Sequence, residues 1–376
     1  MSTSAKPQGQ ARESIFKRHE NLTVLTIFVA FVLIIVLTQL ISSGFREYPT
    51  FISPVNILNI LQQVSVPGIV AVSMTMVMIA RGIDLSVGML ASLVSIVVSL
   101  GVSRWGLGVV PSIAIGIGAA VVLETLMGFI ISRTRVEPFI ITLGGMIAFQ
   151  GIALLLSNSR EVVMQGELDF LTTNLLGGMR DPVTGLVLRL PPYVLMFFLV
   201  AVLGGLMLNY TKYGRRLYAV GSNPRAAFLA GIDVKTMTLS VYVIQGLLVG
   251  IGATMLLARI NTGIITLGTG LEIDTIAMVV IGGTALSGGR GNIVGTVIGV
   301  LFLGSIANAM NMLRLPSEVQ FLTKGLVVIL AVSAGDISSR ISEYRALVGE
   351  RRRVRAAPPA ASQEGGQDDS DISARS

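Results

Sequence analysis

A polar and basic stretch interrupts the apolar chain: Asn209-Tyr-Thr-Lys-Tyr-Gly-Arg-Arg-Leu-Tyr-Ala-Val-Gly-Ser-Asn-Pro-Arg-Ala-Ala-Phe-Leu-Ala-Gly-Ile-Asp-Val-Lys235. Long apolar segments flank it on both sides, so we interpret residues 209–236 as a loop between two membrane spans. Its basic residues outnumber its single acid, Asp233; they are Lys212, Arg215, Arg216, Arg225 and Lys235. Short loops this basic accumulate on the cytoplasmic side of a membrane, so we expect this loop to face the cytoplasm.

A short helix is predicted inside this loop. Asn223 is a preferred N-cap residue, and Pro224 suits the first helical position. A turn and a half from Arg225 to Ala230 follows, and Gly231 is a residue type that ends helices. Such a helix on the cytoplasmic side is a candidate docking element for a soluble partner. The alternative is an ordinary positively charged connector that only sets the topology.

The composition excludes many other classes of protein. The chain has 376 residues, of which 52% are hydrophobic and 13% charged, whereas soluble proteins carry about 25% charged residues. Its mean hydropathy of +0.77 and its 42 glycines are typical of an all-α polytopic membrane protein. It has no cysteine, and its one histidine, His19, lies in the N-terminal tail. Disulfides, thiol nucleophiles and metal sites built on Cys or His are therefore excluded. The net charge of +7 fits cytoplasmic loops facing anionic lipid, not nucleic-acid binding.

Ten membrane spans are expected, because about 20 apolar residues cross the hydrocarbon core. They are Asn21–Ser43, Ile57–Ala80, a third ending near Val102, Leu107–Ile131, Phe139–Leu156, Pro192–Leu208, Met237–Ala258, Leu271–Leu286, Ile293–Leu313 and Val319–Ala334. The eighth is short enough to be discontinuous. An even number of spans puts both termini in the cytoplasm. Residues 1–20 and 337–376 then form cytoplasmic tails around a transmembrane domain of 21–336, and the C-terminal tail is expected to be largely disordered.

Acidic residues at membrane depth are costly and are functional candidates by default. Asp84 lies in Gly82-Ile-Asp-Leu-Ser-Val-Gly88 between two spans, and the alternative is that it merely caps the third span. Asp274 opens the eighth span, where a helix N terminus or a polar ligand explains it. Glu124 lies inside the fourth span, where it either pairs with a base such as Arg133 or lines the interior.

The run Ile281-Gly-Gly-Thr-Ala-Leu-Ser-Gly-Gly-Arg-Gly-Asn-Ile-Val-Gly-Thr296 is not a phosphate loop, because it lacks the lysine that reaches the phosphates. We expect this chain to have no ATP site. Gly291, Gly295 and Gly299 repeat every four residues and predict a smooth packing stripe on the ninth span.

Uncharged hydrogen-bonding side chains lie within or at the ends of the spans. They are Gln62, Gln63, Thr142, Gln150, Asn308 and Gln320. Each alone is expected to join helices, but together they suit a pathway for a polar, uncharged solute.

Several stretches, in this order, resemble the permease subunits of bacterial ATP-binding-cassette importers for ribose, xylose, galactose and similar sugars. They are Gly82–Gly88, Glu137-Pro-Phe-Ile-Ile-Thr-Leu-Gly144, Tyr218-Ala-Val-Gly-Ser-Asn-Pro-Arg-Ala-Ala-Phe-Leu-Ala-Gly-Ile232, Ile281–Gly291 and the segment from Gly295 to Gln320. The resemblance covers roughly residues 50 to 335 and is specific because the motifs occur together.

This resemblance implies a type II-importer-like permease in the bacterial inner membrane that pairs with a second copy of itself. It implies a separate ATPase subunit, which uses ATP and Mg²⁺, and a periplasmic sugar-binding protein; the chain itself binds no cofactor. The predicted short helix is then the coupling helix, with Gly221, Asn223, Pro224, Arg225, Ala226, Ala227, Ala230 and Gly231 as its contact residues. A bulky charged residue at Ala227 is expected to uncouple transport. The candidate pathway residues are Gln62, Gln63, Asp84, Phe139, Thr142, Gln150, Asp274 and Asn308.

The sequence departs from the family's pattern at four positions: Arg81, Gln150, Ala309 and Arg314. Arg81 and Gln150 are therefore expected to alter the choice of solute, which is a pentose, a hexose, a polyol or a signalling sugar such as autoinducer-2. The alternative function is an ion-coupled secondary transporter or channel for a small polar solute that uses Asp84, Glu124 and Asp274. An intramembrane enzyme has no support, because the spans contain no His or Cys and no Ser with a visible base.

Overall fold

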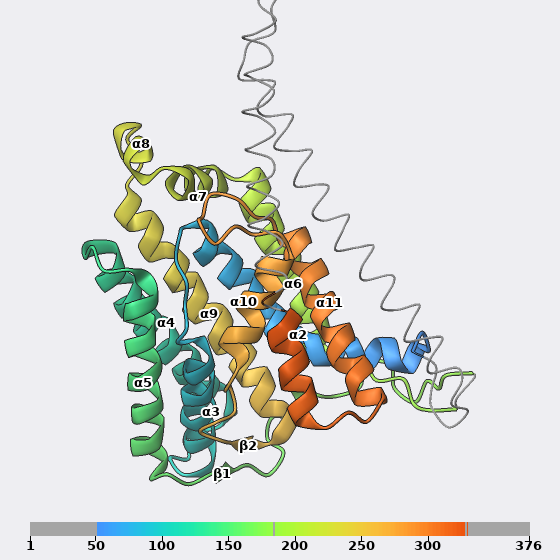
Figure 1. The fold of residues 1–376 in the computed structure, drawn as a ribbon. Coiled ribbons are helices and arrows are strands. Elements are labelled where there is room, and N and C mark those ends of the chain that lie inside the picture. Colours follow the sequence, from blue (N-terminus) through green and yellow to red (C-terminus); the bar gives the residue numbers. More distant parts are fainter. Residues whose placement is uncertain (1–50, 183–184, 328, 330–376) are drawn as a thin grey trace, which may run out of the picture. The chain divides into compact units, whose positions relative to one another are not determined.

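The computed structural model describes residues 51–182, 185–327 and 329. The predicted tails and the first predicted span lie outside these described residues. Figure 1 shows an almost entirely helical arrangement. The helices are α2 (Pro54–Ile79), α3 (Val87–Ser103), α4 (Val109–Arg133), α5 (Pro138–Ser157), α6 (Pro192–Tyr210), α7 (Lys212–Ser222), α8 (Pro224–Leu229), α9 (Val234–Ile260), α10 (Leu271–Ile281) and α11 (Ile293–Met312), with a short 3-10 turn η1 (Asp169–Leu171). Residues 317–327 are also helical.

Six of these helices are long and apolar enough to cross a membrane: α2, α4, α5, α6, α9 and α11. Helix α3 is apolar but has 17 residues. Helix α10 has 11 residues and ends at Ile281, so the eighth predicted span, drawn to Leu286, was too long. The tenth predicted span lies only partly within the described residues. The chain is thus a polytopic helical membrane protein.

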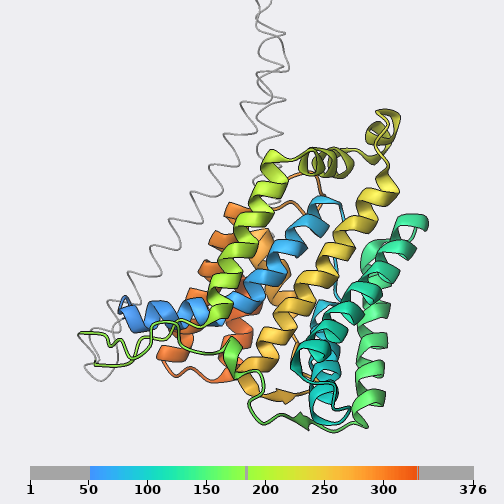
Figure 2. The same ribbon diagram turned by 180° about the vertical axis from the view of Figure 1, so that it is seen from behind.

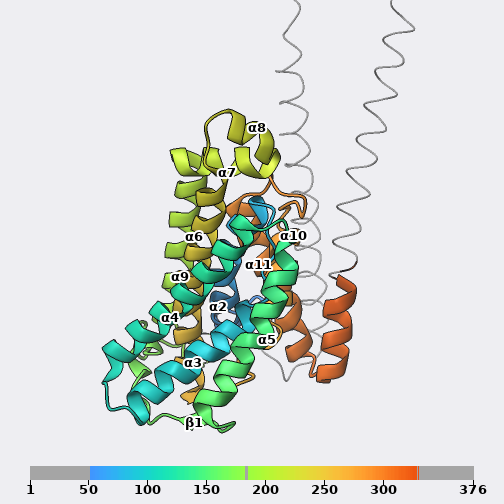
Figure 3. The same cartoon turned by 90° about the vertical axis from the view of Figure 1, so that its left-hand side faces the viewer.

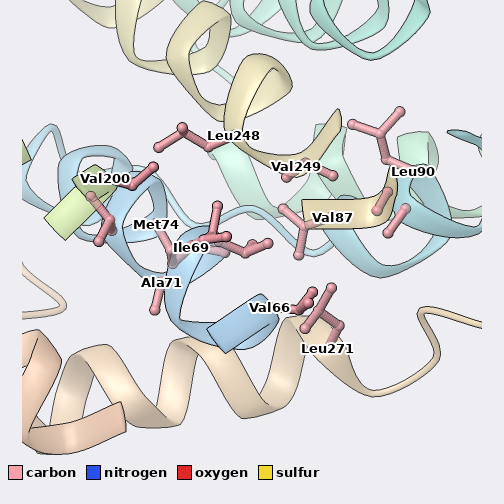
Figure 4. Packing of buried hydrophobic residues seen from close by; sticks show 14 of the residues in the cluster. Val66, Ile69, Ala71, Met74, Val87, Leu90, Val200, Leu248, Val249 and Leu271 are labelled. Atoms are coloured by element: carbon pink, nitrogen blue, oxygen red, sulfur yellow. The ribbon is translucent and has the colours of Figure 1, made fainter. Parts of the chain in front are cut away.

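Helix α2 lies at the centre and is buried along most of its length. It packs against α6, α9, α10 and α11. Figure 4 shows its side chains Val66, Ile69 and Met74 among residues from these neighbours, including Val249 of α9 and Leu271 of α10. From Val64 onward nearly every residue of α2 is buried, as expected of a helix that is apolar on all sides and is surrounded by other helices.

Helices α4 and α9 pack closely because small residues line their contact. A side chain on Gly246 of α9 would place its Cβ 2.6 Å from the Ala120 carbonyl oxygen of α4, and one on Gly250 would meet Ile117. Small residues let membrane helices approach in this way. The outer faces of α4 and α5 carry exposed apolar side chains such as Val122 and Leu155, as expected of surfaces that contact lipid.

Polar connections lie at both ends of the helices (Figures 1 and 2). At one end lie α7, α8, the linker between α2 and α3, and the glycine-rich loop between α10 and α11. At the other, strands β1 (Val162–Val163) and β2 (Thr262–Gly263) pair antiparallel, with Val162 opposite Gly263. The polar elements that the resemblance singles out therefore lie mostly at one end.

Candidate functional site

The loop between α6 and α9 folds into two helices, α7 and α8, each capped by a side chain. The Thr211 Oγ1 accepts a hydrogen bond from the Gly214 N–H at 3.2 Å, and the Asn223 Oδ1 accepts one from the Ala226 N–H at 3.0 Å. The start predicted at Asn223 is found, whereas α7 was missed. Its signal was the polar N-cap Thr211 before the amphipathic run that buries Leu217.

The α7–α8 hairpin (residues 211–233) is anchored to α9. The Tyr213 hydroxyl lies 2.9 Å from the Ser240 Oγ. Burial raises the pKa of Tyr213, and its hydrogen bond to Ser240 partly opposes this shift. At the far end, Asp233 caps α9 by accepting a hydrogen bond from the Thr236 N–H. The hairpin is therefore fixed to the helix that follows it.

Helix α8 lies at the outer end of the hairpin (Figure 3), and its last residues expose apolar side chains. Phe228 is 69% exposed and Leu229 is 80% exposed. Ala227 is 4% exposed, and its carbonyl accepts a hydrogen bond from the Ile232 N–H at 3.0 Å. Gly231, at φ +80°, turns the chain toward α9. A substitution of Ala227 would disturb the hairpin itself, so the exposed pair is the better target for testing a contact.

The linker between α2 and α3 (residues 80–86) holds a buried acidic cluster. The Asp84 Oδ1 accepts hydrogen bonds from the Ser86 N–H at 2.8 Å and the Ser86 Oγ–H at 2.6 Å. The Ser86 Oγ also lies 3.1 Å from the Glu124 Oε1 of α4. Asp84, Ser86 and Glu124 are fully buried. The Asp84 Oδ1 thus accepts the Ser86 N–H at the start of α3 as an N-cap side chain does, whereas Ser86 makes no side-chain capping bond. Asp84 therefore caps the third span, as one of the two interpretations expected, and also belongs to the buried cluster.

Thr142 of α5 holds the same linker from the other side. Its Oγ1 accepts a hydrogen bond from the Leu85 N–H at 3.2 Å and lies 3.1 Å from the Ile83 carbonyl oxygen. Of the eight candidate pathway residues, Asp84 and Thr142 are brought together by this linker. Glu124, which the sequence left between a basic partner and the interior, contacts Ser86 rather than Arg133.

Three other candidates form contacts elsewhere. The Gln62 Nε2 donates to the Arg189 carbonyl at 2.9 Å, and the Asn56 Nδ2 donates to the Asn308 Oδ1 at 2.9 Å. The Lys324 Nζ lies 2.9 Å from an Asp274 carboxylate oxygen in a partly exposed ion pair. These partners, Asn56 and Lys324 among them, were missed, because helix-to-helix pairing is not visible in one sequence.

The side chains of the remaining candidates make no hydrogen bond within the described residues. Gln63 is half-buried on α2, and Gln150 is exposed on α5. Phe139 is 46% exposed at the start of α5. The eight residues thus lie in separate places, and the structure does not gather them into one site.

The glycines of the predicted packing stripe differ from one another in position. Gly295 and Gly299 lie on α11 directly against α10: a Cβ on Gly295 would clash with the Gly282 backbone, and one on Gly299 with the Met278 backbone. Gly291 instead precedes α11 at φ +151° and faces Thr284. Two of the three glycines in the predicted packing stripe, Gly295 and Gly299, therefore lie on α11, and Gly291 does not.

Comparison with known proteins places the chain in a family. Residues 56–332 match the family model described as "Branched-chain amino acid transport system / permease component". The ribose import permease protein of Escherichia coli (strain K12) is 39% identical over 286 residues, covering 76% of this chain and 86% of the relative. That of Bacillus subtilis (strain 168) is 37% identical over 284 residues, covering 76% and 85%. The xylose transport system permease protein of Haemophilus influenzae is 31% identical over 365 residues, covering 83% and 96%.

No solved structure matches the chain. The family model covers well over half of the sequence, and the curated relatives match along most of their length. The resemblance seen in the motifs is therefore confirmed. The chain belongs to this family of transport-system permease components and is a multi-pass protein of the inner membrane.

Proposed function

We propose that this permease is the transmembrane subunit of an ATP-driven importer that moves a monosaccharide or related polyol across the inner membrane. The named relatives are permeases for ribose import and xylose transport, which supports a sugar as the solute. A separate ATPase subunit binds and hydrolyses ATP with Mg²⁺, and a periplasmic sugar-binding protein delivers the solute. This chain contributes no ATPase site.

The observation that carries the proposal is the exposed apolar tip of α8. Phe228 and Leu229 project from a loop that is otherwise basic. An exposed apolar pair at the end of a capped helix is suited to a groove on a soluble protein, because its burial there removes apolar surface from water. We therefore propose α8 as the coupling helix, with Gly221, Asn223, Pro224, Arg225, Ala226, Ala227, Ala230 and Gly231 forming or shaping the contact.

We further propose ten membrane segments with both termini in the cytoplasm, in a homodimer of the type II-importer-like class. Support comes from the distribution of charge. The hairpin, the linker at Arg81 and the loop at Arg290 lie at one end of the helices, and basic loops accumulate on the cytoplasmic side. In this arrangement α8 faces the compartment that contains ATP.

For the solute, we propose Gln63 and Gln150 as the first side chains to test. Neither side chain forms a hydrogen bond within the described residues, and an amide offers both a donor and an acceptor to a sugar hydroxyl. Gln62, Asn308 and Asp274 have partners in the fold and are proposed for the pathway only if those contacts open. Asp84, Thr142 and Phe139 are proposed as residues that shape its wall.

The test is purification of the full chain in mild detergent from the cells that produce it, followed by identification of copurifying proteins. A stoichiometric ATPase is expected with the native chain and is expected to be lost with Leu229→Glu. Leu186→Glu is the matched control, because Leu186 is 51% exposed but lies in the loop that precedes α6. An ATPase retained by Leu229→Glu would overturn the role of α8. Solute transport by the chain alone, without ATP, would favour the ion-coupled alternative.

A further inference from the structure

Arg81 joins the end of α2 to the hairpin that carries α8. Its Nε donates to the Gly221 carbonyl at 2.6 Å, and its Nη2 donates to the Ser222 carbonyl at 2.7 Å. Both carbonyls belong to the last turn of α7, where a helix lacks internal donors and favours a cation. Ser222 directly precedes Asn223, the N-cap of α8. The guanidinium of Arg81 therefore holds the backbone from which α8 starts.

A third segment, the glycine-rich loop between α10 and α11, meets the same junction. The Gly289 N–H donates to the Ile79 carbonyl at 2.9 Å. A Cβ on Gly289 would lie 2.6 Å from the Ser222 Oγ, and one on Gly288 would clash with the Arg81 side chain. These two glycines have φ of +72° and +81°, a conformation that favours glycine. The loop thus fits directly against both α2 and the hairpin.

The junction leaves little room for independent movement. A Cβ on Gly221 would clash with the Ile79 carbonyl oxygen, so the backbones of α7 and α2 are in direct contact. The Tyr218 hydroxyl donates to the Gly291 carbonyl at 2.7 Å, which ties α7 to the loop a second time. Since close-packed contacts transmit displacement rather than absorb it, a push on α8 would reach both α2 and the α10–α11 loop.

Arg81 adopts this position in a strained conformation. Its φ is +69°, in the left-handed region that side chains other than glycine disfavour. The two hydrogen bonds to α7 offset that strain. The sequence-based expectation that Arg81 alters the choice of solute does not fit this placement, because its guanidinium contacts the hairpin.

We propose that Arg81 is a positioning residue for coupling: it transmits displacement of α8 to α2 and the α10–α11 loop. The proposal rests on the proposed function, in which α8 contacts an ATPase. It predicts that loss of the two hydrogen bonds separates ATP hydrolysis from transport while leaving the subunits assembled.

The test is Arg81→Gly in the complete importer, reconstituted in liposomes with its ATPase and binding protein. Glycine accepts the left-handed conformation without strain, so the variant removes the side-chain contacts and spares the backbone. Radiolabelled ribose uptake per ATP hydrolysed is expected to fall about tenfold, within the usual range for coupling between two sites. Subunit stoichiometry, thermal stability and half-saturating ribose concentration should stay unchanged. Arg81→Lys should recover part of the ratio of uptake to hydrolysis. A lysine ammonium can donate to one of the two carbonyls, whereas the arginine guanidinium reaches both.

Arg314→Gly is the matched control. Arg314 also has a positive φ, of +52°, but it follows the far end of α11, a 20-residue helix, about 30 Å from the helix start. This control should leave the uptake-to-hydrolysis ratio intact. An unchanged ratio in Arg81→Gly would overturn the inference, as would equal losses in both variants. Failure of the native chain to assemble with an ATPase would instead overturn the proposed function. The two failures are therefore distinguishable.

Discussion

The α7–α8 hairpin and the linker between α2 and α3 both interrupt an apolar chain with polar residues, yet they are stabilised in opposite ways. The hairpin is exposed, and its side chains cap helices at Thr211, Asn223 and Asp233. The linker is mostly buried from residue 82 to residue 86, and the polar groups there bond to one another and to neighbouring helices; only its Arg81 is exposed, and that side chain bonds to the hairpin. Water can replace a lost contact in the hairpin, but it cannot readily do so in the linker. Loss of a polar side chain should therefore lower the free energy of unfolding more in the linker than in the hairpin.

The hydrogen bonds of the linker also require a proton. A serine hydroxyl has one hydrogen to donate, but the Ser86 Oγ lies within hydrogen-bonding distance of both Asp84 and Glu124. Neither carboxyl group has an ion-pair partner in the part of the chain described. Two buried, unpaired carboxylates would cost several kcal/mol each. We infer that the two carboxyl groups hold one proton between them, because the single Ser86 hydroxyl hydrogen can serve only one of the two carboxyl oxygens that it reaches.

The largest effect is expected from Glu124→Ala. It removes the bond to Ser86 and leaves a cavity beside α9, so the free energy of unfolding in detergent should fall by about 3 kcal/mol. Glu124→Gln should cost about 1 kcal/mol or less, because the amide can still donate to Ser86. Infrared spectra give the decisive measurement: a protonated-carboxyl band should be present in the native protein and lost in Glu124→Gln. Absence of that band from the native protein would contradict the inference that Asp84 and Glu124 hold one proton.

A smaller effect is expected from Thr142→Val. The change keeps the side-chain volume but leaves the Leu85 N–H and the Ile83 carbonyl without the Thr142 Oγ1, which should cost about 2 kcal/mol. Thr125→Val is the matched control, because among the described residues the Thr125 Oγ1 bonds only to the Val121 carbonyl of its own helix. Chemical unfolding of both variants measures the difference. Equal losses would show that the linker gains nothing from the hydrogen bonds across to α5.

The sequence predicted the hairpin better than the linker, and the reason is physical. Caps act over three residues, so the start of α8 is readable from Asn223-Pro224 alone. The contact between Ser86 and Glu124 joins residues 38 positions apart, and a single sequence does not show which helix faces which. The length of α10 was overestimated, because the apolar residues that follow Ile281 lie in a glycine-rich loop and not in the helix. Local chemistry was predictable, whereas helix pairing was not.

The smallest effect is expected from acid at Asp233, the residue that ends the hairpin. Its hydrogen bonds with Thr236 hold the pKa of the Asp233 carboxyl below its usual range. Because the folded-state pKa is the lower one, the stabilising contribution is complete above the unfolded pKa of about 3.9 and is lost as pH falls through the folded value. Acid should therefore loosen the first turn of α9.

Amide hydrogen exchange of residues 234–237 in the intact protein, corrected for intrinsic pH dependence, should reveal this loosening. Asp233→Asn should abolish the pH dependence, because asparagine caps a helix without titrating in this range. The same pH dependence in Asp233→Asn would assign the effect to another group. Residues 83–86 supply the internal reference, since their one carboxyl group, that of Asp84, is shielded from water. If acid increased exchange equally in both segments, burial of the carboxyl group would not protect the linker from acid. The difference in stability between the linker and the hairpin would then have to come from packing alone.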